Sequence, residues 1–320
     1  MSTLYKCKIC DNSRNNQEII GHEMMFGFND EFIYFKCAAC GCLQINEPPA
    51  DIARYYPADQ YYSFQNRTGM GYKSLIKDFL FKLYYNRIIN KNFFYQKESN
   101  LLSVLRETHK SSPILDVGCG NGSFLQQMAI WGFKNLTGID PFIEKEITLN
   151  KNSGKILKEN IFEHQGSYSL IMMSGVLEHM DNQYNVMKEL HRLLKDDGRV
   201  LIQIPVTDSF AWRKYGVNWF QLDAPRHFCI HSVRSMNLLS EKAGFAVKEE
   251  HYESGAYQFI ESEKYIRNLK YSDDFPFSSR YIKECHKHAD FLNKIKDGDV
   301  VRFVLQKKIV NKSIIVDESF

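Results

Sequence analysis

A short glycine-rich segment constrains this chain more than any other part of it. Ile114–Val117 is an apolar run that contains one acid, Asp116, and a helical pattern covers Ser123–Ile130. Between them glycine occupies alternate positions: Gly118, Gly120 and Gly122. Glycine lacks a Cβ and tolerates positive φ, so a ligand can lie close to such a backbone. The pattern predicts a strand, a tight loop and a helix whose N-terminus faces a ligand, as in open α/β sheets.

The spacing of the glycines indicates which cofactor binds. Nicotinamide dinucleotide sites favour G-x-G-x-x-G, whereas here the third glycine comes one residue early and Ser123 follows it. The order D-x-G-x-G-x-G resembles the first motif of class I S-adenosylmethionine-dependent methyltransferases. A second strand is expected at residues 135–139 and ends at Asp140, about twenty residues after the glycines. A carboxylate there can accept hydrogen bonds from both ribose hydroxyls.

The same resemblance continues along residues 112–248. A third strand ends at Asn160, where most relatives carry Asp beside the adenine amino group. A fourth, Tyr168–Ser174, leads into a segment whose backbone lies beside the methionine moiety in that family, which implies Ser174 as a cofactor contact. A turn at 196–198, a fifth strand at 199–205 and a helix at 233–243 follow. The family implies a Rossmann-like seven-stranded sheet with the last strand antiparallel; an unrelated nucleotide-binding α/β domain is the alternative.

Composition narrows the class of protein. The chain has 320 residues and a net charge of only +3, and this charge alone gives no strong case for a nucleic acid partner. No apolar run approaches the roughly 18 residues of a membrane span, and the first residues lack the apolar core of a signal peptide. We therefore expect a cytoplasmic protein. In a reducing compartment its eight cysteines indicate metal binding or packing rather than disulfides.

Four of the cysteines form two C-x-x-C pairs near the N-terminus: Cys7, Cys10, Cys37 and Cys40. Two such knuckles complete a tetrahedral zinc site with four thiolates. Because four cysteines leave no open position, we expect the zinc to be structural. Cys42 and His22 are spare candidate ligands, and four reduced cysteines in a core are the alternative.

The cysteine pairs suggest a division of the chain. We expect a zinc module at residues 1–48, a tyrosine-rich linker with helices at 49–110, and a catalytic domain at 111–310. Within that domain, residues 207–232 are expected to form a lid and 255–298 a helical insertion. The module and the tyrosine-rich stretch resemble those of methyltransferases in bacterial sugar and polysaccharide pathways. The resemblance implies that Tyr62 reaches over the cofactor, although these tyrosines could instead only pack the module onto the main domain.

The expected lid carries the candidate base. An imidazole has a reference pKa near working pH, which suits removal of a proton from an acceptor. His227 resembles the base of sugar methyltransferases with this architecture, and His179 follows the fourth strand near the cofactor. Either histidine could instead have a local structural role. Arg226 could hold a substrate anion or form a salt bridge to Asp223 or Asp208.

These features predict an S-adenosylmethionine-dependent methyltransferase. Its acceptor is expected to be a small molecule, with a hydroxyl of a sugar or nucleotide-linked sugar as the leading interpretation. That interpretation rests on family analogy. An RNA methyltransferase with a zinc module and a non-catalytic partner that binds the cofactor are the alternatives.

Overall fold

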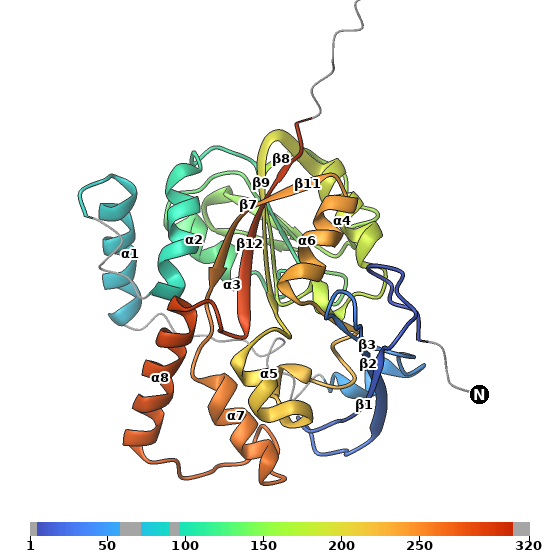
Figure 1. Ribbon diagram of the computed structural model, residues 1–320. Helices are drawn as coiled ribbons and strands as arrows, with labels where there is room; N and C mark the ends of the chain where they lie inside the picture. The colour runs from blue at the N-terminus through green and yellow to red at the C-terminus, as the bar shows by residue number, and fades with distance from the viewer. Residues whose placement is uncertain (1–4, 58–71, 90–95, 310–320) are drawn as a thin grey trace, which may run out of the picture.

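The computed structural model describes residues 5–57, 72–89 and 96–309 (Figure 1). Within these ranges the strands form one large sheet and one small sheet. Helices cover both faces of the large sheet, and the small sheet lies to one side of it, near the carboxyl ends of its strands (Figure 1). No helix among the described residues is long and apolar enough to cross a membrane.

The large sheet confirms the predicted Rossmann-like architecture. In sheet order its strands are β11 (Phe245–Tyr252), β12 (Val300–Lys307), β9 (Leu194–Pro205), β8 (Tyr168–Ser174), β4 (Ile114–Val117), β5 (Leu136–Ile139), β7 (Gly154–Leu157) and β6 (Ile147–Thr148). Strands β9, β8, β4, β5 and β7 are parallel to their neighbours within this group. The last strand, β12, is antiparallel to both β9 and β11, as predicted. The two-residue edge strand β6 adds an eighth strand to the predicted seven.

Alternation along the strands builds a core on each face of the sheet, because successive side chains of a strand point to opposite faces. On β4, Leu115 packs in the cluster that contains α4 (Gln183–Leu193) and α6 (Val233–Lys242). Its neighbour Ile114 packs in the opposite cluster, with α1 (Tyr72–Tyr85), α2 (Gln96–Glu107) and α3 (Ser123–Ile130). The central parallel strands are therefore covered on both faces, as their continuous apolar runs require.

One strand begins earlier than the sequence predicts. We expected a turn at 196–198 before a strand at 199–205, but β9 already begins at Leu194. Tyr168 pairs with Leu194 and Leu170 pairs with Arg199, so the register shifts between these two pairs. The residues expected to form a turn make an irregularity inside the strand instead, as in a β-bulge.

The small sheet joins two segments that are far apart in the sequence. Its strands are β1 (Gln17–His22), β2 (Glu31–Lys36), β3 (Leu43–Ile45) and β10 (Cys229–Ile230), in that order. The first three belong to the N-terminal module, whereas β10 comes from the segment expected to form a lid. The pairing of β10 with β3 is antiparallel, with Ile230 opposite Leu43. The lid segment is thus bonded to the module through backbone hydrogen bonds.

The lid segment is also folded and packed. It contains α5 (Phe210–Tyr215) and the 3-10 helices η5 (Gly216–Asn218) and η6 (Phe220–Leu222). Trp219 is fully buried in a third core, which also takes in Tyr34 of the module, Phe259 of α7 (Tyr257–Ile266) and Leu292 of α8 (Ser279–Lys294). Module, lid segment and C-terminal helices therefore share one core. Three further 3-10 helices are η1 (Ile52–Tyr55), η3 (Asn150–Asn152) and η4 (Leu177–His179).

Candidate active site

The glycine loop has the conformation that its composition predicts. Gly118, Gly120 and Gly122 all have positive φ, at 69°, 54° and 71°. A Cβ on Gly118 would lie 2.5 Å from Cγ2 of Val176, and one on Gly122 would lie 1.9 Å from Cδ1 of Ile156. Glycine is required at both positions by backbone conformation and by the available space. The loop therefore packs closely against its neighbours at the carboxyl ends of the parallel strands.

Two carboxyl groups lie beside this loop. Asp140 directly follows β5; its Oδ2 accepts a hydrogen bond from the amide of Gly120 at 2.9 Å, and its Oδ1 accepts one from the amide of Phe142 at 2.9 Å. Asp116, on β4, is buried. Burial raises the pKa of Asp116 to about 7, and the nearby charge of Asp140 acts in the same direction. Bound cationic groups would therefore be favoured here.

The remaining cofactor candidates lie at the same edge of the sheet. Asn160 comes three residues after β7, and its Oδ1 accepts hydrogen bonds from the amides of Phe162 and Glu163 at 2.9 and 3.2 Å. Ser174 is the exposed last residue of β8. Tyr62 lies outside the described residues. Asn160 and Ser174 thus take the strand-end positions at which open α/β sheets bind ligands.

The structure brings the two candidate bases together. The rings of His179 and His227 meet edge to face, with centroids 4.5 Å apart. Nδ1 of His179 lies 2.9 Å from the carbonyl oxygen of Arg226 and 3.1 Å from the hydroxyl of Tyr56. Nδ1 of His227 lies 2.8 Å from the carbonyl oxygen of Gln221. Because a carbonyl oxygen only accepts, each Nδ1 carries the proton and each Nε2 keeps a lone pair.

Burial keeps this cluster uncharged. Although His179 keeps some exposed surface, burial lowers its pKa to about 3, and the proximity of His227 acts in the same direction. Burial also lowers the pKa of His227 below its ordinary value. The adjacent Glu178 is buried, and its Oε2 has no hydrogen-bond partner among the described residues. Burial raises the pKa of Glu178 to about 8. At neutral pH the cluster therefore holds two uncharged imidazoles beside a protonated carboxyl group.

Arg226 is not available to a substrate. Its side chain is fully buried, and its Nη2 lies 2.6 Å from Oδ1 of Asp223 and 2.9 Å from Oε1 of Glu23. Its Nη1 donates to the carbonyl oxygen of Tyr55 at 3.1 Å. Of the two salt bridges considered, the one to Asp223 forms, whereas Asp208 accepts from the amide of Val233 at the start of α6. Glu23 was not predicted as a site residue from the sequence; its apolar neighbours, Met24 to Phe26, were the available signal.

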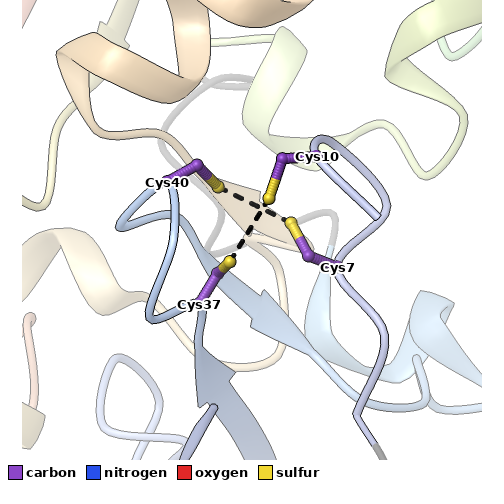
Figure 2. A group of neighbouring side chains, drawn as sticks. All are labelled: Cys7, Cys10, Cys37 and Cys40. Carbon is purple, nitrogen blue, oxygen red and sulfur yellow. Dashed lines mark hydrogen bonds between the residues drawn. The ribbon is translucent and has the colours of Figure 1, made fainter. Parts of the chain in front are cut away.

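The four cysteines of the two C-x-x-C pairs converge (Figure 2). Their sulfur atoms lie within 4.8 Å of one another, at 3.6 Å between Cys7 and Cys40 and 3.5 Å between Cys10 and Cys37. Four sulfurs at about 2.3 Å from a tetrahedral zinc would be roughly 3.8 Å apart. All four are free thiols. The spacing of the thiols therefore fits a tetrahedral metal site.

The knuckle backbones support the same arrangement. The amide of Gly41 donates to the carbonyl of Cys37 at 2.9 Å, and the amide of Asp11 donates to that of Cys7 at 3.0 Å. Of the two spare candidates, Cys42 is adjacent, with its sulfur 3.5 Å from that of Cys7. His22 instead lines a small cavity beside Trp219.

The sheet order and the glycine loop define the class: this is a class I S-adenosylmethionine-dependent methyltransferase domain. Residues 86–250, just over half of the chain, match the family described as "Methyltransferase domain", and the chain belongs to this family.

Curated relatives match a shorter segment. The tRNA U34 carboxymethyltransferase of Campylobacter concisus is 28% identical over 104 residues, which are 30% of this chain and 36% of that protein. The ubiquinone biosynthesis O-methyltransferase of Cronobacter sakazakii is 28% identical over 110 residues, 31% of this chain and 44% of that protein. The chain thus spans less than half the length of these relatives.

Solved structures with a similar arrangement include a SAM-dependent methyltransferase from Archaeoglobus fulgidus. It is 20% identical with a TM-score of 0.44, and the match covers 72% of this chain and 99% of that one. A mycolic acid cyclopropane synthase complexed with SAH is 17% identical with a TM-score of 0.44, and the match covers 74% and 95% of the two chains.

Proposed function

We propose that the protein methylates a small-molecule acceptor with S-adenosylmethionine, and that the acceptor is a hydroxyl of a sugar or nucleotide-linked sugar. Membership of the methyltransferase family supports the cofactor and the reaction. The observation that carries the proposal is the contact between two uncharged imidazoles, the partly buried His179 and the buried His227, beside the carboxyl ends of the parallel strands. A hydroxyl acceptor must lose a proton during transfer, and this pair provides acceptors for it.

The cofactor site is assigned to the glycine loop and the strand ends. The backbone of Gly118, Gly120 and Gly122 would lie against the nucleoside, and Asp140 would accept hydrogen bonds from its ribose hydroxyls. Asn160 would lie beside the adenine amino group, and Asp116 and Ser174 would hold the methionine end. Tyr62 is proposed to reach over the cofactor. When bound, S-adenosylmethionine supplies a methyl carbon activated by sulfonium, so the protein's task is alignment and proton removal.

The imidazoles are oriented for that task. In both histidines Nδ1–H is held by a backbone carbonyl, which fixes the ring and leaves Nε2 to receive a proton. His227 is the first choice for the base and His179 the second. Asp223 lies 3.8 Å from Nε2 of His227, close enough to stabilise the imidazolium that forms.

Labelled S-adenosylmethionine tests the proposal against a panel of nucleotide-linked sugars. We expect transfer of label to one of them, and His227→Ala should lower the rate by roughly 10²–10⁴ if it is the base. His179→Ala in parallel decides between the two histidines. His251→Ala is the control, because His251 lies on β11 and pairs with Glu249. A rate loss under about threefold for both variants would leave neither histidine as the base.

We also propose that Cys7, Cys10, Cys37 and Cys40 bind one structural zinc ion. Four thiolates leave no coordination position for a substrate, so the metal would stabilise the module and take no part in methyl transfer. The free state of all eight cysteines is consistent with the reducing cytoplasm that we propose as the protein's location.

One observation favours a second function. Among the relatives is a tRNA-modifying enzyme, although its match covers under a third of this chain. A salt-dependent gel shift with tRNA, followed by transfer of label to it, would favour an RNA methyltransferase over a small-molecule enzyme. Binding of S-adenosylmethionine with no transfer to either class would favour a non-catalytic partner protein.

A further inference from the structure

Backbone pairing connects the N-terminal module to the segment that carries His227. Strand β3 of the module pairs with β10, two residues beyond that histidine. The amide of Ile45 also donates to the carbonyl of Phe228 at 2.9 Å, and the amide of Phe228 donates to the carbonyl of Glu178 at 2.7 Å. Phe228 therefore bridges the module on one side and η4, which carries His179, on the other.

A side chain of the module contacts the backbone of His227 directly. Tyr34, on β2, is fully buried, and its hydroxyl donates to the carbonyl oxygen of His227 at 2.9 Å. Its ring packs in the core shared by the module and the lid segment. The position of the His227 backbone is thus set by a residue 193 positions away in the sequence.

An ion cluster provides the third connection. Glu23 and Arg226 are both completely buried, and Asp223 completes the cluster. Glu23 is itself held by its own loop, since its carboxylate accepts from the amides of Phe26 and Phe28 at 3.0 Å. A buried charge that loses its partner is strongly destabilising, because it must regain either water or another opposite charge. This cluster therefore strongly favours one position of Arg226.

The contacts that hold Arg226 also involve His227 and His179. Asp223 has a positive φ of 39°, and its carbonyl accepts from the amides of Arg226 at 2.8 Å and His227 at 3.2 Å. With Oδ1 of Asp223 engaged by Arg226, its Oδ2 faces Nε2 of His227. Arg226 also presents its backbone carbonyl to Nδ1 of His179. One turn of chain thus sets the orientation of both imidazoles.

We propose that the N-terminal module is part of the active site: Glu23, acting through Arg226, and Tyr34, acting on the backbone of His227, are positioning residues that hold His227 against His179. This inference rests on the proposed function, because it gives the module a role in placing the groups that remove the acceptor's proton. It predicts that the module controls the position of the histidine pair while the glycine loop keeps its own geometry.

The test uses the full chain with ¹³C-labelled histidine and needs no acceptor. The variants are Tyr34→Phe, which removes one oxygen, and Glu23→Gln, which removes one charge. Glu253→Gln is the matched control, because Glu253 is also fully buried and paired with a buried arginine, Arg302, on the large sheet. NMR follows the ring signals of His227 and His179 with pH, hydrogen exchange follows the amide of Phe228, and calorimetry measures binding of S-adenosylhomocysteine.

The titration of His227 reports directly on its surroundings. The charged and titratable groups that face it are His179, Glu178, Asp223 and Arg226, with the Tyr34 hydroxyl on its backbone. Because burial lowers the pKa of His227, in the wild type we expect its ring to stay neutral at pH 6.5, the ordinary histidine pKa, and to protonate only below it. In both variants the ring signal should move, the pKa of His227 should rise towards that value as water reaches the ring, and the Phe228 amide should exchange about tenfold faster. S-adenosylhomocysteine affinity should stay within about twofold of the wild type.

A purely structural role predicts a different result. Glu253→Gln should lower stability but leave the His227 signal and the Phe228 exchange unchanged. If Tyr34→Phe and Glu23→Gln behave like this control, the inference is overturned; if Glu23→Gln does not fold, Tyr34→Phe alone decides. Failure of the wild type to bind S-adenosylhomocysteine would instead refute the proposed function, so the two failures are distinguishable.

Discussion

Replacing Gly122 by alanine tests the glycine loop in its least forgiving position. An alanine at φ of 71° costs roughly 1–2 kcal/mol in backbone strain. Its Cβ would also lie 1.9 Å from Cδ1 of Ile156, which is fully buried, and overpacking of this kind costs about 1–3 kcal/mol. We therefore expect Gly122→Ala to lower the free energy of unfolding by about 2–5 kcal/mol.

The clash can be separated from the strain. Ile156→Val removes the clashing Cδ1 and alone should cost about 0.5–1.5 kcal/mol, so the double variant should be more stable than additivity predicts by about 1–3 kcal/mol. Gly132→Ala is the control, because Gly132 has a φ of 96° but its nearest Cβ neighbour would be at 3.4 Å. Urea unfolding measures the free energy of unfolding of the wild type and of all four variants. If Gly122→Ala costs no more than Gly132→Ala, or if Ile156→Val gives no relief, the packing argument is wrong.

Three further predictions concern the acids and the metal. Asp140→Asn should weaken S-adenosylhomocysteine binding by about 1–3 kcal/mol in calorimetry, because an amide NH₂ would face a backbone donor; unchanged affinity would count against its ribose role. The raised pKa of Glu178, about 8, means that its contribution to stability is full below the unfolded value and is lost as pH rises through 8. Glu178→Gln should therefore flatten the fall in Tm between about pH 4.5 and about pH 8, and an unaltered profile would exclude a buried neutral carboxyl group. Metal analysis should find about one zinc per chain, with chelation lowering the Tm; a metal-free, equally stable protein would contradict the cysteine assignment.

Local patterns predicted the elements that are long, periodic and bounded by glycine. The helix expected at 233–243 is α6, Val233–Lys242, and Gly244 follows it with a φ of 90°. The glycine loop and its strand were predicted correctly because positions with positive φ favour glycine, so the residue type itself indicates the backbone conformation. The irregular start of β9 was missed, since Asp-Asp-Gly is also a typical turn sequence.

The connection between module and lid could not be read from the sequence. Strand β10 has two residues, and its pairing with β3 is a contact across almost two hundred positions that leaves no local periodicity. The partner of Arg226 was ambiguous for the same reason: Asp223 and Asp208 are near in sequence, whereas Glu23 is near only in space. The candidate bases were identified individually, but their mutual contact depends on this long-range packing.

Binding of the cofactor at the glycine-lined carboxyl ends of the strands is the property from which the other proposals follow. Isothermal titration of the full chain with S-adenosylhomocysteine measures this directly. We expect saturable binding of about one molecule per chain, weakened in Asp140→Asn and retained in Tyr34→Phe. A purified, folded chain that gives no binding heat at several temperatures with either S-adenosylhomocysteine or S-adenosylmethionine would contradict the account.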